Sequence, residues 1–338
     1  MSILQNISLK PYNTFGIDAL AAHFIQANDI YALKTTLSDS NWHNTPKLVL
    51  GEGSNILFTG HYEGLVIHNQ IKGIEIIDED KQHVFIKVGA GVNWHQFVIY
   101  CVENNYAGVE NLSLIPGTVG AAPVQNIGAY GVELKDTLFC VDTISIDGKT
   151  KKILHNKDCE FGYRDSIFKN KLKDQCIITH VTFQLNKQST FHITYGAIQE
   201  TLNQIHVGDL TLKAISNAII SIRQSKLPNP KNIGNAGSFF KNPIIKTTTF
   251  HDLQKKHSNM PFYIISEEEV KVPAAWLIEQ LGFKGKQFGN VGVYDKQPLV
   301  LVNHGNASGK EVYDLSEKIK ASVLDKFNIL LNTEVNII

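Results

Sequence analysis

The stretch IPGTVGAAPVQNIGAYG, residues 115–131, restricts the fold and function of this sequence more than any other. A second glycine-rich loop, GEGSN at residues 51–55, directly follows the apolar run KLVL at residues 47–50. Because glycine has no Cβ, successive backbone N–H groups in such loops can converge on phosphate oxygens. The two segments together predict a cradle for the pyrophosphate of a dinucleotide. Neutral hydrogen bonds would come from Ser54, Asn55, Thr118 and Asn126.

Tight turns in a β-rich domain would explain one such glycine cluster, but two clusters weaken that alternative. Two common nucleotide-binding patterns do not fit. Residues 89–94, GAGVNW, place Trp94 where the dinucleotide fingerprint GxGxxG requires its third glycine. Gly309-Lys310 is followed by Glu311, where a P-loop needs Ser or Thr. The sequence therefore favours dinucleotide binding without a Rossmann fold or a P-loop.

Short apolar runs bounded by turn residues predict β-strands around the glycine-rich segments. They cover residues 47–50, 64–69, 83–89, 141–146 and 177–185. Asp147-Gly148 separates residues 143–146 from residues 152–154, and this dipeptide tolerates the positive φ angles of a tight hairpin. Antiparallel pairing is therefore expected at that point.

Helices are indicated by capping residues and by apolar spacing. Asn93 with Gln96 resembles a capping box, which predicts a short helix ending near Gly108. Apolar residues at helical spacing predict a longer helix over 211–224, before Pro228 blocks its continuation. Pro273 is expected to open a third helix that ends at Gly282. Ser308 and Glu311 form a capping box for a fourth, covering the apolar positions of residues 312–323.

The length of 338 residues favours two domains. The proline-rich stretch KLPNP at residues 226–230 is the expected boundary. We therefore predict a first domain over residues 1–225 and a second over residues 226–338. The strands and helices together predict the α+β class.

Composition excludes several functions. Lys plus Arg and Asp plus Glu both total 32, so the chain lacks the positive field of a nucleic-acid binder. No stretch approaches the roughly 20 apolar residues of a membrane span, and the N-terminus does not resemble a signal peptide. The four cysteines form no CxxC pair, and the 13 histidines form no HExxH or HxH arrangement with acidic partners. We expect a cytoplasmic, soluble monomer without a metal site and without disulfides.

Five segments, in order along the chain, carry a resemblance to a known family. They are Asn13-Thr14-Phe15, residues 51–55, residues 115–131, GYRDS at 162–166 and GNAGSFFKNP at 234–243. Together they resemble the UDP-N-acetylenolpyruvoylglucosamine reductase family, the MurB family, and its type I branch. The resemblance implies an FAD-binding domain of the vanillyl-alcohol-oxidase (PCMH) type, followed by the C-terminal α+β substrate domain of that family.

The resemblance also implies a reaction. NADPH would reduce non-covalently bound FAD, and the flavin would reduce UDP-N-acetylglucosamine enolpyruvate to UDP-N-acetylmuramate in peptidoglycan precursor synthesis. Three residues take the family's catalytic roles: Ser238 as the proton donor, and Arg164 and Glu334 as groups that stabilise the intermediate. The family often has Glu-Pro where this chain has Asn332-Thr333 before Glu334. A fixed guanidinium is chemically suited to an enolate that forms only during the reaction.

The resemblance further implies two sets of binding residues. Those expected to bind the cofactor are Gly51, Glu52, Gly53, Ser54, Asn55, Ile115, Pro116, Gly117, Thr118, Gly120, Ala121, Gln125, Asn126, Gly128, Ala129 and Tyr130. Those expected to bind the substrate are Tyr163, Tyr195, Lys226, Asn242 and Gln297. Tyr195 in Thr194-Tyr195-Gly196 and an insertion around it, near 190–210 in the first domain, resemble the type I branch, in which a loop tyrosine closes over the uridine nucleotide.

Each of these residues also has an ordinary structural interpretation. Ser238 could be a turn residue, Arg164 could pair with Asp165 at the surface, and Glu334 and Lys226 could be solvated. Two other functions stay open from the sequence. One is an oxidase on the same flavin fold that passes electrons to oxygen, and the other is a nucleotide-sugar-binding protein without activity. No chemical motif is apparent in residues 244–269.

Overall fold

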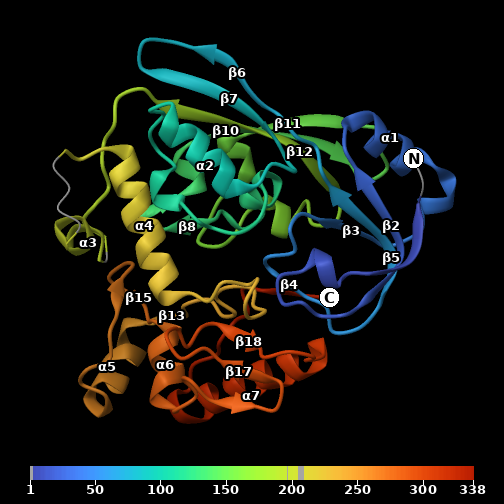
Figure 1. Cartoon of the computed structure of the whole chain (residues 1–338). Coiled ribbons are helices and arrows are strands. Elements are labelled where there is room, and N and C mark those ends of the chain that lie inside the picture. The colour runs from blue at the N-terminus through green and yellow to red at the C-terminus, as the bar shows by residue number, and fades with distance from the viewer. Residues whose placement is uncertain (1–2, 196, 205–208) are drawn as a thin grey trace. The chain divides into compact units, whose positions relative to one another are not determined.

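The computed structural model describes residues 3–195, 197–204 and 209–338 (Figure 1). The described chain divides into two compact units. The first comprises residues 3–7, 21–52 and 62–225, and the second comprises residues 8–20, 53–61 and 226–338. The chain thus passes between units at Ser225 and Lys226, and two earlier segments also belong to the second unit. The sequence did not predict that these two segments leave the first unit.

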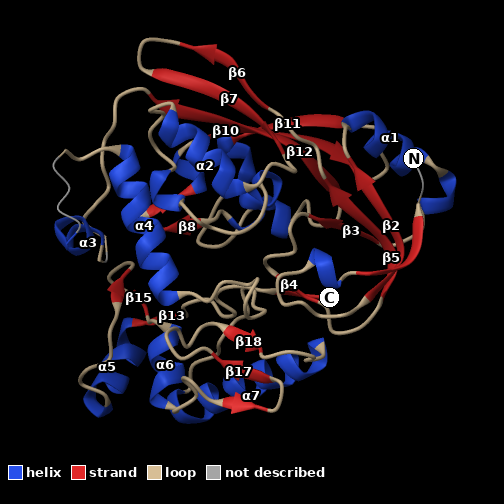
Figure 2. Cartoon of the chain, viewed as in Figure 1, coloured by secondary structure: helices blue, strands red, loops and turns tan. Residues whose placement is uncertain are grey.

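The first unit contains three sheets, and Figure 2 shows its strands in red. One has the order β1-β2-β5-β3, from Leu4–Ser8, Leu20–Ala27, Tyr62–Asn69 and Lys47–Leu50. The second has the order β11-β10-β12-β7-β6, from Lys151–His155, Leu138–Ser145, Cys176–Asn186, His83–Gly89 and Ile74–Glu79. The third pairs β8 (Gly128–Ala129), in the glycine-rich segment, with β9 (Val132–Glu133), which directly follows that segment.

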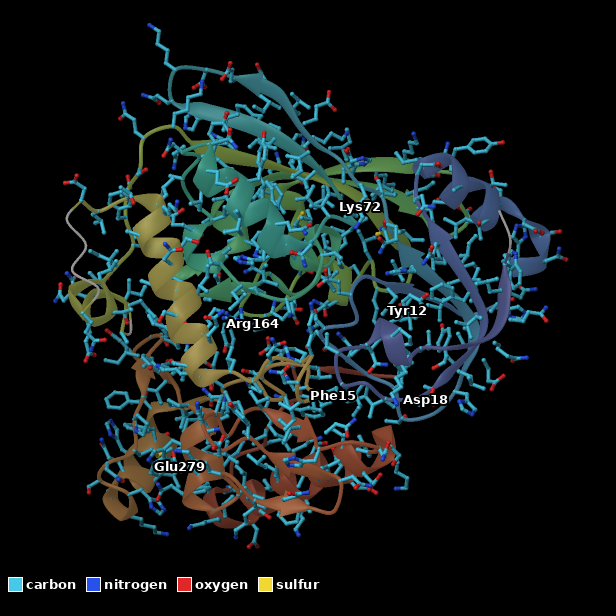
Figure 3. All side chains as sticks on the ribbon, viewed as in Figure 1. Tyr12, Phe15, Asp18, Lys72, Arg164 and Glu279 are labelled. Atoms are coloured by element: carbon cyan, nitrogen blue, oxygen red, sulfur yellow. The ribbon has the colours of Figure 1, made fainter. Side chains whose placement is uncertain are left out.

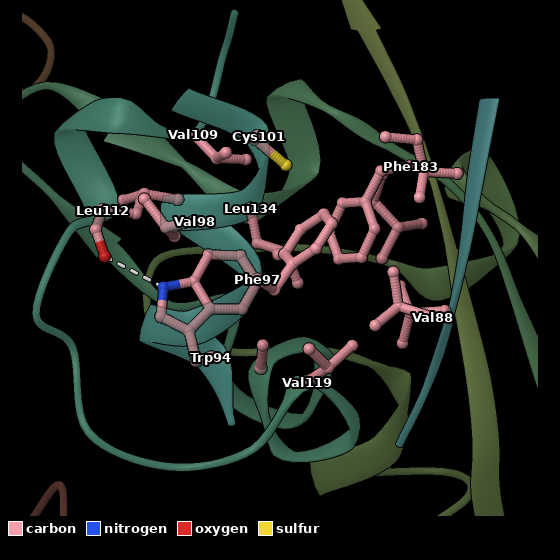
Figure 4. Packing of buried hydrophobic residues seen from close by; sticks show 14 of the residues in the cluster. Val88, Trp94, Phe97, Val98, Cys101, Val109, Leu112, Val119, Leu134 and Phe183 are labelled. Atoms are coloured by element: carbon pink, nitrogen blue, oxygen red, sulfur yellow. Dashed lines mark hydrogen bonds between the residues drawn. The ribbon is translucent and has the colours of Figure 1, made fainter. Parts of the chain in front are cut away.

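The main core of the first unit lies between the five-stranded sheet and helix α2 (Trp94–Glu103). Figure 4 shows Trp94, Phe97 and Phe183 meeting at its centre. The ring centroids of Phe97 and Phe183 are 4.5 Å apart. Trp94 is 1% exposed, and its indole N–H donates to the carbonyl of Leu112 at 2.9 Å, so the polar atom of this large side chain is satisfied. This contact fixes the chain just before the glycine-rich segment.

The parallel strands β2, β5 and β3 form a second core with helix α1 (Ile30–Ser38). Asp29 caps this helix by accepting from the N–H of Ala32 at 2.7 Å. Helices α3 (Ile198–Gln204) and α4 (Leu212–Lys226) pack on each other through a third, smaller core. The predicted insertion near 190–210 includes Gly196 and residues 205–208, which lie outside the described residues.

The second unit contains three small sheets and three helices. Its sheets have the orders β13-β15-β14, β16-β17-β18 and β19-β4. The strands are β4 (Ile56–Leu57), β13 (Ile244–Lys246), β14 (Tyr263–Ile264), β15 (Glu269–Lys271), β16 (Gln287–Phe288), β17 (Val291–Val293), β18 (Leu301–Asn303) and β19 (Asn336–Ile337). The helices are α5 (Thr247–Lys256), α6 (Ala274–Gln280) and α7 (Gly309–Phe327). Residues 244–269, which carried no motif, form β13, α5 and β14 of this unit.

The predicted strands and helices are confirmed, with small shifts at their ends. The predicted hairpin pairs Thr143 with Lys152, and its loop runs from residue 146 to 149 with Gly148 at a φ of 75°. Helix α2 ends at Glu103 and not near Gly108, because the N–H of Asn104 bonds back to Tyr100 and Val102 and closes the last turn. The Ser308 capping box is present in full, with each side chain accepting from the backbone N–H of the other residue.

The four cysteines are all free, and Cys101, Cys140 and Cys159 are buried. Burial raises the pKa of Cys159 to about 12 and that of Cys176 to about 11, so these thiols are poor nucleophiles at neutral pH. Among the described helices, none has the length and apolar character needed to cross a membrane.

Three half-buried histidines predict how stability depends on pH. Burial lowers the pKa of His68, His95 and His180, and a neighbouring cation lowers each further. Unfolded histidine titrates near about 6.5, so below this pH the unfolded chain binds more protons than the folded one. We therefore expect the free energy of unfolding to fall as the pH is lowered from about 7 towards 5. Urea unfolding at each pH, followed by circular dichroism, measures this free energy.

The effect of exposed carboxylates on stability can be separated from that of the histidines, because the carboxylates have lower pKa values. Hydrogen bonds from backbone N–H groups lower the pKa of Asp80 and of Glu311 in the folded chain, and both groups are mostly ionised at pH 5 in either state. The variant His180→Gln should show a smaller loss of stability between pH 7 and 5 than the natural chain. A stability that is flat or rises over this range would contradict the prediction.

Candidate functional site

The two glycine-rich segments meet within the first unit through Gly51 and Thr118. A Cβ on Gly51 would lie 2.5 Å from Oγ1 of Thr118, so only glycine allows this approach. The carboxylate of Glu52 continues the contact: it accepts from the N–H of Gly117 at 3.1 Å and from the amide of Asn93 at 2.6 Å. Residues 51–52 and 117–118 therefore form one continuous surface.

Several polar groups of the predicted phosphate cradle form hydrogen bonds within the protein. The N–H of Gly117 is bound by Glu52, and the N–H of Gly120 donates to the carbonyl of Ala90 at 2.9 Å. The amide of Asn126 donates to Glu133 and Gly162, and its oxygen accepts from the N–H of Lys135. These groups hold the segment in shape because their hydrogen-bonding capacity is used within the protein. A contribution of Gly117, Gly120 or Asn126 to cofactor binding would therefore act through the shape of the loop.

Gly53 and Ser54 fit a bound phosphate better. Gly53 has a φ of +61°, and a Cβ there would lie 2.1 Å from the carbonyl oxygen of Tyr12. Its own carbonyl accepts from the N–H of Thr14 at 3.1 Å, so this loop is fixed against the segment Tyr12–Thr14 of the second unit. Within the described residues, the N–H groups of Gly53 and Ser54 donate no hydrogen bond. Two adjacent donors on a rigid loop suit the oxygens of a phosphate.

Asn55 has a structural partner that the sequence did not predict. Its amide donates to the carbonyl of Glu334 at 3.2 Å, and its own carbonyl accepts from the backbone and side-chain N–H groups of Asn336. Strand β19 then runs parallel to β4, with Asn336 beside Ile56. The end of the glycine-rich loop therefore carries the backbone on which Glu334 lies.

Ser238 and Glu334 lie on two neighbouring segments of the second unit. Phe240 pairs with Thr333 in an antiparallel bridge, and the N–H of Glu334 donates to the carbonyl of Phe239 at 2.8 Å. Ser238 forms a bridge with Val300 on its other side. Phe239 and Phe240 are at most 1% exposed, and their burial fixes the half-buried Ser238 between them and Gly237. Two of the three predicted catalytic residues are thus held by one small ladder.

The motif Asn13-Thr14-Phe15 organises the same unit. The Asn13 side chain is 6% exposed and closes its own loop by bonding Leu9 and Ile17. The carbonyl of Thr14 accepts from the N–H of Asn235, and the ring of Phe15, labelled in Figure 3, packs edge-on against Phe239 at 6.3 Å. The motif therefore connects the glycine-rich loop at Gly53 with the GNAGSFFKNP segment.

Arg164, the third predicted catalytic residue, lies in the first unit (Figure 3). Its Nη2 donates to the carbonyl of Gly128 at 2.7 Å, and Gly128 leaves room for the guanidinium because it has no side chain. Its backbone has a φ of 54°, and Tyr130 and Asn126 have φ values of 52° and 44°. Non-glycine residues in this conformation store strain, and such strain is concentrated at functional sites.

Arg223, which the sequence analysis missed, belongs beside Arg164. It lies on α4, its side chain is half-buried, and it forms a hydrogen bond with the side chain of Tyr130. Burial lowers the pKa of Arg223, and the nearby positive charge of Arg164 lowers it further. Within the described part of the chain, no carboxylate forms a salt bridge with it. Two neighbouring cations that are partly shielded from water repel each other, and a bound anion relieves this repulsion, so this place suits an anionic ligand.

The amino-acid composition could have indicated that Arg223 is a candidate site residue. Lys plus Arg total 32, yet Arg164 and Arg223 are the two arginines of the sequence. A chain that uses lysine almost everywhere has arginine at positions where the planar, permanently charged guanidinium matters. In the structure, these two residues act electrostatically on each other.

Tyr195 lies at the end of the glycine-rich segment and is 48% exposed. A Cβ on Gly131 would lie 3.5 Å from Cβ of Tyr195, which is ordinary van der Waals contact. The buried amide of Asn111 donates to the carbonyls of Tyr130 and His192, and so fixes the start of the Tyr195 loop to the same segment. An exposed tyrosine on an anchored loop can reach a bound ligand. The other predicted tyrosine, Tyr163, lies beside Arg164: its ring centroid is 5.8 Å from the guanidinium carbon.

The remaining predicted substrate residues belong to the second unit. Lys226 is the last residue of α4 and the first of that unit. The Asn242 oxygen accepts from the N–H of Ala274 at 2.9 Å, so this side chain also caps helix α6. Gln297 accepts from the N–H of Leu299 at 3.4 Å within its own loop. In the described chain, no cluster of three or more His, Cys, Asp or Glu could hold a metal ion.

Comparisons with known proteins cover the whole chain. Residues 229–338 match the family described as UDP-N-acetylenolpyruvoylglucosamine reductase, C-terminal domain, and residues 21–153 match the family described as FAD binding domain. The UDP-N-acetylenolpyruvoylglucosamine reductases of Amoebophilus asiaticus and Flavobacterium johnsoniae are 53% and 51% identical, over 100% of this chain and of theirs. The solved structure of UDP-N-acetylenolpyruvylglucosamine reductase (MurB) from Thermus caldophilus is similar in fold. It has a TM-score of 0.66 at 22% identity and covers 99% of this chain and 98% of its own.

Proposed function

The chain belongs to the UDP-N-acetylenolpyruvoylglucosamine reductase family, and we propose that it catalyses the reaction for which that family is named. It is an FAD-dependent oxidoreductase that uses NADPH to reduce UDP-N-acetylglucosamine enolpyruvate to UDP-N-acetylmuramate, in peptidoglycan synthesis. The observation that carries this proposal is the high identity to named reductases over the full length, because it includes both the FAD-binding part and the C-terminal part. When bound, FAD accepts hydride from NADPH and returns hydride to the enolpyruvyl group.

Residues 51–55 and residues 115–130 would each contribute to holding the cofactor, without a covalent bond. The unused N–H groups of Gly53 and Ser54 would bind its phosphates, and the Gly51–Thr118 contact would keep the two loops together. Glu52 would keep the turn at Gly117 in place. The substrate is an anion as well, and the charge of Arg164 and Arg223 would attract its carboxylate or diphosphate.

Arg164 would act on the reacting group. Hydride addition to the enolpyruvyl methylene carbon moves charge onto the carboxylate as an enolate. A guanidinium stabilises this enolate more strongly than it stabilises the substrate in its ground state. The hydrogen bond to Gly128 and the strained backbone would keep Arg164 in one orientation before the substrate arrives. Ser238 would then donate a proton to the carbon next to the carboxylate. Glu334, held through its backbone by Phe239 and Asn55, would stabilise the intermediate with Arg164.

Absorbance spectroscopy on the purified protein tests the proposal directly. The protein should be yellow and release FAD on denaturation, NADPH should bleach the flavin absorbance, and the enolpyruvyl nucleotide should restore it faster than air does. A colourless protein that FAD cannot reconstitute would refute the proposal. Reoxidation by air that is faster than by the nucleotide would indicate an oxidase.

The substitution Gly53→Ala tests whether the loop at residues 53–55 holds the cofactor. Its Cβ would collide with the backbone of Tyr12, so the loop must move and FAD affinity should fall at least about tenfold, with a stability loss of about 2 kcal/mol. Gly16→Ala is a matched control, since Gly16 has a φ of +67° and nothing within 4 Å of an added Cβ. It should cost only about 1 kcal/mol of stability and keep FAD. Fluorescence titration and thermal unfolding measure both; equal effects would rule out the steric argument.

Tyr195→Phe and Lys226→Ala should weaken binding of the uridine nucleotide about 10- to 100-fold, because each removes a hydrogen bond to a charged group. Reduction of the flavin by NADPH should change little. Tyr31→Phe is the control for the lost hydroxyl, since Tyr31 is 80% exposed on α1. Isothermal titration with the nucleotide and stopped-flow absorbance measure the two effects. Equal damage to nucleotide binding and to flavin reduction would mean that these residues serve the fold.

A further inference from the structure

Leu114 has a left-handed backbone and lies immediately before the cofactor segment. Its φ is 59°, a left-handed conformation that is unfavourable for a residue with a branched side chain. Residues 115–118 follow directly, so the direction of this segment depends on the conformation of Leu114. Something in the fold must therefore hold Leu114 in place.

Both peptide groups at Leu114 are bound by side chains from helices. Its N–H donates to Nδ1 of His95, on α2, at 3.0 Å. Its carbonyl accepts from Nε of Arg223, on α4, at 3.3 Å. The two preceding residues are held from the same helices. Leu112 accepts from the indole of Trp94 (Figure 4), and the hydroxyl of Ser113 meets that of Ser216 at 2.8 Å.

The contact with His95 requires a neutral imidazole. Because Nδ1 accepts the proton of Leu114 N–H, the ring must carry its own proton on Nε2. Burial lowers the pKa of His95, and the charge of Arg223 lowers it further. The imidazole is therefore kept in the form that can accept this hydrogen bond at neutral pH.

We propose that His95 is a positioning residue that holds Leu114 in the left-handed conformation and so shapes residues 115–118 for the cofactor before it binds. The inference rests on the proposed function, since it assigns this segment to FAD. His95 has no role in the reaction itself. Its hydrogen bond offsets the conformational cost at Leu114, and that cost would otherwise reduce FAD affinity.

A double-mutant cycle on FAD affinity tests this inference. His95→Phe keeps a planar ring without the acceptor, and Leu114→Gly removes the cost of the left-handed conformation. His95→Phe should weaken FAD binding about tenfold in the natural background but less than about threefold in the Leu114→Gly background. His43→Phe, at an exposed histidine, is the control and should bind FAD normally. Fluorescence titration of the FAD-free protein gives the four affinities.

An equal loss in both backgrounds, or no loss, would overturn the inference while the proposed function stands. Failure of the natural chain to bind FAD would overturn both. If His95→Phe does not fold, lowering the pH serves in its place, because protonation of His95 removes the same hydrogen-bond acceptor. Arg223 is the charged group that acts on this ring. FAD affinity should then fall more steeply from pH 7 to 5 in the natural chain than in Leu114→Gly. Parallel pH profiles would overturn the inference.

Discussion

Ser238→Ala should slow the reaction with the enolpyruvyl nucleotide at least about 100-fold and leave the reduction of the flavin by NADPH unchanged. The two half-reactions differ because only the second needs a proton on carbon. Removal of a positioned proton donor costs roughly 10² to 10⁴ in rate. A serine hydroxyl is a weak acid, but an enolate carbon is basic enough to take its proton across about 3 Å. Stopped-flow absorbance after mixing pre-reduced enzyme with the nucleotide gives the rate.

Further measurements distinguish the loss of the proton donor at position 238 from damage to the fold. Ser238 lies next to two buried phenylalanines, so FAD content and thermal unfolding of Ser238→Ala must match those of the natural chain. Ser238→Cys keeps an ionisable hydrogen and should recover part of the rate. Ser322→Ala, on the exposed face of α7, should have no effect. Near-normal reaction of Ser238→Ala with the nucleotide would reject Ser238 as the donor, even if FAD and NADPH behave as proposed.

The helices and strands that were predicted have signals that are local, whereas others, such as α1 and α5, were missed. The capping box of Ser308 and Glu311 satisfies backbone N–H groups within three residues, so the sequence alone contains the whole interaction. Thr211 likewise accepts from the N–H of Ala214 at the start of α4. Alternating burial along β7 reproduces the apolar pattern of its sequence. Such features depend on spacing, which can be read without knowing the fold.

The roles of individual loop residues could not be predicted, because their partners are distant in sequence. Asn55 and Glu334 are 279 positions apart, yet the amide of one bonds the carbonyl of the other. Glu52 bonds Gly117 across 65 positions. A polar residue in a glycine-rich loop has the same appearance whether it binds a ligand or the protein itself. Residue type and spacing could not decide between these two uses.

Buried charge is the other property that required the structure. Arg223 lies on a helix that was correctly predicted over 211–224, but the sequence does not show that its guanidinium is partly shielded from water and bonded to Tyr130. The sequence shows that Arg164 and Arg223 are its two arginines, but the electrostatic interaction between them is known only from the folded chain.

Arg164→Met should reduce the rate of the second half-reaction by about 10² to 10³, the cost of removing one preorganised group that stabilises an oxyanion. The negative charge appears only as the reaction proceeds, so kcat should fall far more than the nucleotide KM rises. Arg164→Lys should be intermediate, since it keeps the charge and loses the planar fork that bonds Gly128.

Lys171→Met is the matched control for the lost charge. Its ammonium pairs with Glu160 at the surface seven residues from Arg164, and pairs of this kind contribute little. It should leave both half-reactions unchanged. Because Arg164 also holds the carbonyl of Gly128, the FAD content of Arg164→Met must be measured first, and rates are compared per bound flavin. If both half-reactions slow equally at full FAD content, or if only KM changes, Arg164 serves to bind ligands and does not stabilise the enolate.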